Sequence, residues 1–224
     1  MRRAAALGAL ALFLSACQQP VQASEKPVEA PAPKRVADEG KGLQTAIFAG
    51  GCFWGVEGVF SHVKGVTSAI SGYHGGNGKN ADYAAVSGGR TGHAEAVKVT
   101  YNPEIVRYDQ LLRIFFSVIA DPTTLNYQGP DHGTQYRSAL VPLDAEQRKV
   151  AAAYLAQIKA SGVWHKPIVT RIEAYRAFYP AEAHHQDFMA AHPRHPYIVQ
   201  WDAPKVKALK RIFPGMYRAG FVTG

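Results

Sequence analysis

The sequence predicts a single α+β domain, an α/β two-layer sandwich in which a mixed sheet packs against helices. Short apolar segments with the period of strands are interspersed along the chain with longer segments that have the period of helices. The chain has 224 residues, of which 47% are hydrophobic and 19% are charged. This length and composition are typical of a globular domain with a core of its own.

The first residues are typical of an export signal. Arg2 and Arg3 precede an uncharged run, 4–16, that is too short to span a bilayer and has the length of a secretory signal core. The run ends in Leu14-Ser15-Ala16-Cys17, which resembles the lipobox of bacterial lipoproteins. We therefore expect residues 1–16 to be a signal peptide and Cys17 to carry lipid. An ordinary signal peptide with a chance cysteine is the alternative, and both interpretations predict export.

Residues 17–43 differ in composition from the rest of the chain. Several prolines lie among Ala, Glu, Lys and Gln, with few large apolar side chains and no period. Such a segment is expected to be a flexible tether that starts at the lipidated Cys17. The folded domain is then expected to span 44–224, and the protein to face the periplasm from a membrane anchor.

The first half of the domain contains five elements. Residues 44–49 form a short apolar run that ends at two glycines, which predicts a buried strand. Residues 52–62 have the length and apolar spacing of a helix, and 65–73 have the pattern of a strand. Residues 94–101 alternate as a strand does, and 108–119 are typical of a well-buried helix.

The second half continues the mixture of strands and helices. Residues 137–143 have a strand-like pattern, and Asp144 is a suitable N-cap for a helix over 145–160. Residues 168–175 alternate as a strand does. Two further helices are expected at 181–191 and 204–213, each ending before a proline, and two long glycine-rich connections at 72–92 and 120–136.

The charge balance is basic but diffuse. The chain has 25 Lys and Arg against 17 Asp and Glu, a formal net charge of +8. Such a balance suits an anionic partner such as a membrane surface. The basic residues do not form the dense runs that mark nucleic-acid patches, so no nucleic-acid partner is expected.

A reactive cysteine is expected at the start of the first helix. The segment Gly50-Gly51-Cys52-Phe53-Trp54-Gly55 places Cys52 where a glycine turn leads from a strand into a helix. The unpaired N–H groups of a helix start favour a thiolate, so we expect the pKa of Cys52 to be lowered. The alternative is a small buried hydrophobic side chain.

This segment resembles the active-site signature of the type A peptide methionine sulfoxide reductases. The resemblance extends over about 45–186, in the order and spacing of that family. The other matching blocks are Gly72-Tyr73-His74-Gly75-Gly76, Tyr83, Thr91-Gly92-His93-Ala94-Glu95, Asp131-His132-Gly133-Thr134-Gln135-Tyr136-Arg137-Ser138, Tyr179-Pro180-Ala181-Glu182 and His185-Gln186.

The resemblance implies that methionine-S-sulfoxide, in proteins and also free, is reduced to methionine. Cys52 would attack the sulfoxide sulfur and be left as a sulfenic acid. Displacement of the oxygen needs an acid, and Glu95 is the matching residue. For this role the pKa of Glu95 must be raised, and we expect burial beside aromatic rings to raise it.

The resemblance also assigns supporting residues. It implies that the hydroxyl groups of Tyr83 and Tyr136 lie near the sulfoxide oxygen. Phe53 and Trp54 would form an apolar pocket for the methyl group of the substrate. Asp131 would support the hydrogen-bond network. Taken singly, each of these residues could have a merely structural role.

The sequence departs from the family pattern in its second half. Many members carry one or two further cysteines near the C-terminus, whereas no cysteine follows Cys52 here. The sulfenic acid would then be reduced by an external thiol, thioredoxin-like, glutaredoxin-like or glutathione. We expect no bound cofactor or metal, a monomer, and oxidised methionine-containing envelope proteins as substrates.

Three alternatives remain at this point. A cysteine hydrolase could use Cys52 with His93 or His185 as base. A lipoprotein could retain the fold only to bind Met-rich or other apolar segments. A metal site could form from four histidines that lie close together in sequence, although no second ligand cluster completes it: His184, His185, His192 and His195.

Overall fold

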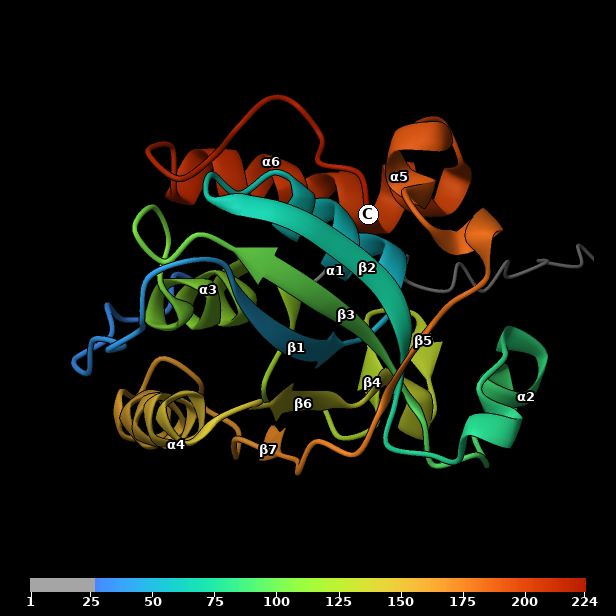
Figure 1. Ribbon diagram of the computed structural model, residues 1–224, viewed down its shortest axis with the longest axis horizontal. Helices are drawn as coiled ribbons and strands as arrows, with labels where there is room; N and C mark the ends of the chain where they lie inside the picture. The colour runs from blue at the N-terminus through green and yellow to red at the C-terminus, as the bar shows by residue number, and fades with distance from the viewer. Residues whose placement is uncertain (1–26) are drawn as a thin grey trace, which may run out of the picture.

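The computed structural model describes residues 27–224, which form one mixed sheet with helices packed on it (Figure 1). The strand order in the six-stranded sheet is β7-β6-β1-β3-β2-β8. Strands β6 and β7 pair in parallel, and the other neighbours in this sheet pair antiparallel. The predicted α+β class with a mixed sheet is confirmed. The strands are β1 Gln44–Gly50, β2 Val66–His74, β3 Ala94–Tyr101, β6 Ser138–Val141, β7 Arg171–Ile172 and β8 Phe178–Pro180, with β4 Tyr127–Gln128 and β5 Asp131–His132 as a separate pair.

The helices differ in length and type. In the described part of the chain, no helix combines the length and the hydropathy that a membrane span requires. The α-helices are α1 Phe53–Ser61, α2 Tyr83–Ser87, α3 Tyr108–Ile114, α4 Ala145–Ala160, α5 Phe188–Ala191 and α6 Ala203–Ile212. Shorter helical turns are η1 Gly78–Asn80, η3 Thr134–Tyr136 and η4 Ala183–His185 of 3₁₀ type, and η2 Phe115–Ile119 and η5 Ile198–Asp202 of π type.

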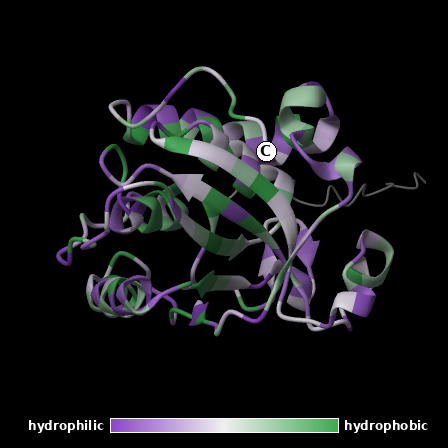
Figure 2. Ribbon diagram, in the orientation of Figure 1, coloured by the Kyte–Doolittle hydropathy of each residue, from purple (hydrophilic) through white to green (hydrophobic). Residues whose placement is uncertain are grey.

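One face of the sheet carries the main core. Phe48 of β1 contacts Phe60 of α1, with ring centroids 4.8 Å apart, and Phe115 after α3, at 5.5 Å. The opposite face carries a small cluster of short side chains, including Ile47 and Ala96, against Phe178. Helix α4 shows green and purple segments in Figure 2, in keeping with one buried and one exposed side. The result is two layers, a sheet and the helices on one of its faces.

Most predicted elements lie where the sequence indicated. Helix α4 begins after Asp144, whose Oδ1 accepts a hydrogen bond from the backbone N–H of Gln147 at 2.7 Å, so the predicted N-cap is confirmed. The predicted strand 168–175 is reduced to β7. The predicted connections are not structureless, because 72–92 contains η1 and α2, and 120–136 contains β4, β5 and η3.

The predicted helix 181–191 is wrong. The chain forms η4, then an extended Gln186 and a left-handed Asp187 with φ of 55°, and α5 starts only afterwards. The Gln186 side chain explains the break, because its amide bonds both the backbone N–H and the carbonyl of Ser71 on β2. This long-range contact outweighs the local helical pattern.

The predicted flexible tether is also wrong for 28–39. Ala30 is fully buried, and its backbone N–H donates to Ser117 Oγ at 2.9 Å. Glu39 accepts a hydrogen bond from the Tyr101 hydroxyl and one from the Tyr108 backbone N–H. The segment therefore belongs to the folded body, because small alanines fill gaps that a search for large apolar residues overlooks. The predicted signal peptide and Cys17 lie outside the described residues.

Candidate active site

Cys52 lies at the turn between β1 and α1, as the N-cap of that helix. Gly51 makes the turn possible, because its φ is +92° and a Cβ there would lie 2.6 Å from the Gln128 Cβ. Cys52 is half-buried and borders a cavity. It is therefore accessible to small molecules, as a nucleophile must be.

The charge around Cys52 differs from the expectation. The Trp54 backbone N–H favours the thiolate, as predicted for a helix start. Burial, followed by the carboxyl groups of Glu95, Asp202 and Asp131, nevertheless raises the pKa of Cys52 well above its ordinary value. The predicted lowering of this pKa is therefore wrong for the substrate-free protein. The local sequence shows the helix start but not the carboxyl groups that the fold brings to it.

Glu95 lies on β3, opposite Tyr73 of β2, and is 2% exposed. Its Oε2 accepts a hydrogen bond from the Phe53 backbone N–H at 2.9 Å, which places the carboxyl group at the start of α1 beside Cys52. Burial raises the pKa of Glu95 to about 8. The expected burial and raised pKa are confirmed, and the group carries a proton near neutral pH.

Tyr83 and Tyr136 approach the same place from α2 and η3. Burial, and then the charge of Glu95, raise the pKa of both hydroxyl groups, and both also feel the charges of Cys52 and Asp131. They are therefore neutral hydroxyl donors near the carboxyl group. The structure brings these predicted residues together.

Glu182 holds the start of α2. Its Oε1 accepts a hydrogen bond from the Tyr83 backbone N–H, and its Oε2 accepts one from the Tyr73 hydroxyl, each at 2.8 Å. The carboxylate thus ties α2 to the sheet beside Glu95.

The two aromatic residues of the motif have different surroundings. Phe53 is 1% exposed and packs against Tyr73, with ring centroids 5.8 Å apart, so it backs the site. Trp54 is half-buried and stacks on Phe188 at 3.7 Å. Its indole N–H donates to Nδ1 of His185 at 3.3 Å, which fixes the ring. Trp54 is therefore the more accessible apolar surface near Cys52.

Asp131 is joined by two residues that the sequence did not indicate. The Tyr197 hydroxyl donates a hydrogen bond to Asp131 Oδ2. Asp202 is 1% exposed, has no hydrogen bond to its carboxyl oxygens from the described residues, and lies 3.9 Å from Lys205 Nζ. Burial raises the pKa of Asp202 to about 7. Both residues come from η5 or its edge, about 150 positions after Cys52, where no motif marks them.

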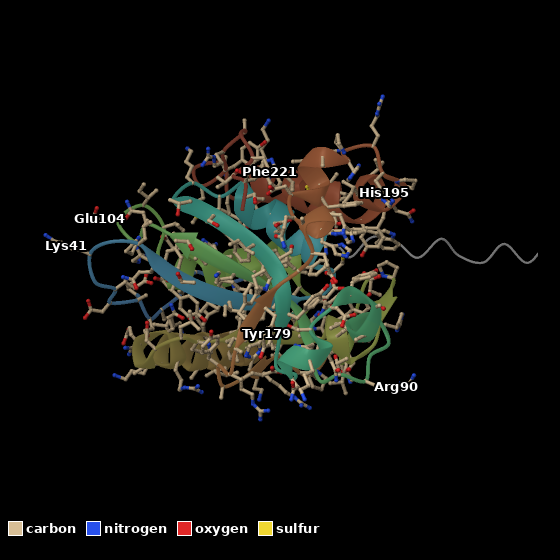
Figure 3. The ribbon with its side chains drawn as sticks, turned by 45° about the vertical axis from the view of Figure 1, so that its right-hand side comes forward. Lys41, Arg90, Glu104, Tyr179, His195 and Phe221 are labelled. Atoms are coloured by element: carbon tan, nitrogen blue, oxygen red, sulfur yellow. The ribbon has the colours of Figure 1, made fainter. Side chains whose placement is uncertain are left out.

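The histidines surround the aromatic residues. His184 and His185 pack ring on ring at 4.1 Å, and His195, labelled in Figure 3, contacts both Trp54 and Phe188. Within residues 27–224, no group of three or more His, Cys, Asp or Glu could hold a metal ion. Nδ1 of His93 accepts from the Gly76 backbone N–H and Nε2 meets the Asn77 carbonyl. Both His93 nitrogens are thus occupied, which disfavours this ring as a hydrolase base.

Comparisons with known proteins identify the family of the chain. The family model described as peptide methionine sulfoxide reductase matches residues 44–215. Peptide methionine sulfoxide reductase MsrA 2 of Mesorhizobium japonicum is 54% identical over 176 residues, 79% of this chain and 90% of that protein. MsrA 2 of a Synechocystis strain is 45% identical over 184 residues, 82% of this chain and 86% of that protein.

Solved structures show the same fold. Mxr1 from Saccharomyces cerevisiae in reduced form superposes with a TM-score of 0.58 at 32% identity, over 72% of this chain and 92% of that chain. Methionine sulfoxide reductase A of Corynebacterium diphtheriae gives a TM-score of 0.58 at 29% identity, over 79% of this chain and 87% of that chain. With the matches in sequence, they show that the chain belongs to the peptide methionine sulfoxide reductase family and is an oxidoreductase of the MsrA kind.

Proposed function

We propose that the protein reduces methionine-S-sulfoxide through a sulfenic acid on Cys52. The observation that carries this proposal is the protonated, buried carboxyl group of Glu95, fixed at the start of α1 beside an accessible sulfur. A thiolate nucleophile and an adjacent acid are what displacement at a sulfoxide requires.

The reaction transfers one oxygen atom. The Cys52 thiolate attacks the sulfoxide sulfur while Glu95 delivers a proton to the oxygen. Attack joins the two sulfur atoms, and the protonated oxygen then passes from the methionine sulfur to Cys52 Sγ as that sulfur–sulfur bond breaks. Cys52 is left as a sulfenic acid and methionine leaves, so the substrate is reduced and the cysteine is oxidised by two electrons. The neutral hydroxyl groups of Tyr83 and Tyr136 stabilise the charge on the departing oxygen.

Binding of the substrate depends on the aromatic residues of α1. Trp54 offers its half-buried ring to the methyl group, with Phe53 packed behind the site. The hydrogen bond from Tyr197 holds Asp131, which orients the polar part of the site.

The oxidised cysteine requires an external reductant. No cysteine follows Cys52 in the sequence, and Cys17, once lipidated, has no free thiol. We infer that an external thiol reduces the sulfenic acid, so that the protein works as a single-cysteine reductase.

The cellular site of action follows from residues 1–17. The uncharged run and the segment ending in Cys17 support export and lipid attachment, with repair of oxidised envelope proteins as the role. The anchor is tested by fractionation without detergent. Cys17→Ala is expected to leave the membrane fraction, and a variant that stays bound would refute the anchor.

The chemistry is tested by a single turnover without reductant. The chain carrying Cys17→Ala is prereduced, desalted and mixed with methionine-S-sulfoxide. About one equivalent of methionine and a trapped sulfenic acid are expected, as the mechanism requires. Cys52→Ser should form none, and Glu95→Gln should react about 100-fold more slowly near neutral pH. No methionine from the parent chain would refute the proposal, and an acyl-enzyme would favour a hydrolase.

A further inference from the structure

The cavity that borders Cys52 has a volume of about 420 Å³. Its lining includes Cys52, Asp131 and Tyr197 of the proposed site, and it extends from there to residues that the proposed sulfoxide chemistry does not use. It runs between α6 and the turn η2, whose residues form facing walls. A cavity of this size accommodates a small organic molecule.

One face of α6 lines this cavity. Pro204, Lys207, Ala208 and Arg211 have the spacing of residues on a single helical face. From the first to the last, this face spans about 10 Å, given the rise of a helix. An extended tripeptide has a similar length, about 10 Å. The cavity therefore offers a trough as long as a tripeptide, with Cys52 on its lining.

The charges of the cavity favour an anion. Three cationic side chains, Lys205, Lys207 and Arg211, border it. Its two carboxyl groups already have donors from the protein, since Asp131 accepts from the Tyr197 hydroxyl and Asp121 accepts from the backbone and hydroxyl of Thr123.

Lys207 and Arg211, the two exposed cations of the cavity and hence its outer cations, are unpaired. Within residues 27–224, neither Lys207 nor Arg211 forms an ion pair, whereas Lys205 lies 3.9 Å from Asp202. Lys207 and Arg211 are exposed, so their charges are available to a ligand that enters the trough.

We propose that this cavity binds a small thiol that carries carboxylates, of the class of acidic peptide thiols such as glutathione, and that this thiol regenerates Cys52. The proposal rests on the proposed function, because it supplies the reductant for the sulfenic acid. The carboxylates pair with Lys207 and Arg211, and the apolar sides of the peptide lie against Trp164 and Trp201.

The regeneration takes two steps. The ligand sulfur attacks the Cys52 sulfur and the S–O bond breaks. The hydroxyl group of the sulfenic acid leaves as water with the proton of the thiol, and a mixed disulfide remains. A second molecule of the same thiol attacks the ligand sulfur. This releases the disulfide of the small thiol and returns Cys52 to its reduced form.

The test compares two thiols in steady-state reduction of methionine-S-sulfoxide by the Cys17→Ala chain. Reversing both outer charges, with Lys207→Glu and Arg211→Glu together, is expected to raise the KM for reduced glutathione about tenfold. The KM for dithiothreitol, a neutral thiol, should not change. Lys210→Glu is the matched control, because this side chain lies on the same helix but over the Tyr217 ring, at 5.5 Å, and both KM values should stay unchanged.

Three results would overturn the proposal. In the first, glutathione fails to support turnover although dithiothreitol does. In the second, the double variant leaves the KM for glutathione unchanged or changes both KM values equally. In the third, only the KM for a reduced thioredoxin rises, which would make the cavity a docking site for a dithiol protein. A failure of the proposed function can be told apart from a failure of this proposal. If the proposed function is wrong, no methionine forms in the single turnover without reductant.

Discussion

Asp202 is the residue with the least expected position beside Cys52. It is buried without a hydrogen bond from the described residues, and its charge is among the causes that raise the pKa of Cys52. A thiol that stays protonated is protected from adventitious oxidation, because the thiolate is the reactive form. Asp202 therefore acts against reaction in the resting protein.

We predict that Asp202→Asn makes Cys52 more reactive. Removal of one negative charge lowers the pKa of the thiol, so alkylation by iodoacetamide at about pH 8 should be about fivefold faster. The difference should vanish well below pH 7, because Asp202, with a pKa of about 7, is then protonated in the parent chain. Asp121→Asn is the control, since Asp121 borders the same cavity and is not among the charges that raise this pKa. Equal effects of both variants would contradict the assignment.

The sequence predicted the site residues that lie in motifs and missed those that lie outside them. Cys52 and Glu95 could be found because local motifs match a known family, and the burial of Glu95 follows from its place on a central strand. Tyr197 and Asp202 could not be found, because only the tertiary fold brings their segment to Cys52. The error in the pKa of Cys52 has the same origin.

At the scale of the element, α1 is the centre of the site and of the core. It contacts β1, β2 and β3 on one side and α5, α6 and η5 on others. In Figure 1, α6 lies beside α1, in agreement with these contacts. Gly55 permits the close approach of η5, because a Cβ there would overlap the Asp202 carboxyl group.

We predict that Gly55→Ala destabilises the fold and separates α1 from η5. The added methyl group must displace the buried carboxyl group of Asp202, which costs about 1–3 kcal/mol in the free energy of unfolding. Urea denaturation measures this change. Gly40→Ala is the control, because nothing lies within 4 Å of a Cβ there, and its effect should stay within about 0.5 kcal/mol. A neutral Gly55→Ala would show that the helix and η5 are not tightly packed.

At the scale of the whole molecule, the core contains more than one buried acid. Glu57 on α1 is fully buried and accepts a hydrogen bond from the Asp187 backbone N–H at 3.0 Å. Burial raises its pKa to about 8, as it does for Glu95. Such groups bind protons more tightly when the chain is folded than when it is unfolded, so folding is favoured while they are protonated.

The protein should therefore lose stability as the pH rises. The pKa of each carboxyl group is raised from its ordinary value of 4.5 to about 8, so the loss of stability occurs between these two pH values. Above about pH 8 the loss is complete. Urea midpoints measured from about pH 5 to about pH 8 should fall steadily. Glu57→Gln should make the free energy of unfolding fall less steeply with pH, by about 1 kcal/mol per pH unit within this window. A midpoint that rises with pH would contradict the raised pKa values.

The packing of 28–39 on the body also limits how far the enzyme can travel. If lipid holds Cys17, only the stretch up to Pro27 separates the anchor from the folded body, ten residues in place of the twenty-six of a tether to 43. A chain of that length extends at most about 35 Å, compared with about 90 Å for the longer one. The folded body would then stay close to the lipid surface. Its effective concentration near proteins of the same membrane would therefore be high. Oxidised methionines close to the bilayer surface would be repaired in preference to those of freely diffusing proteins.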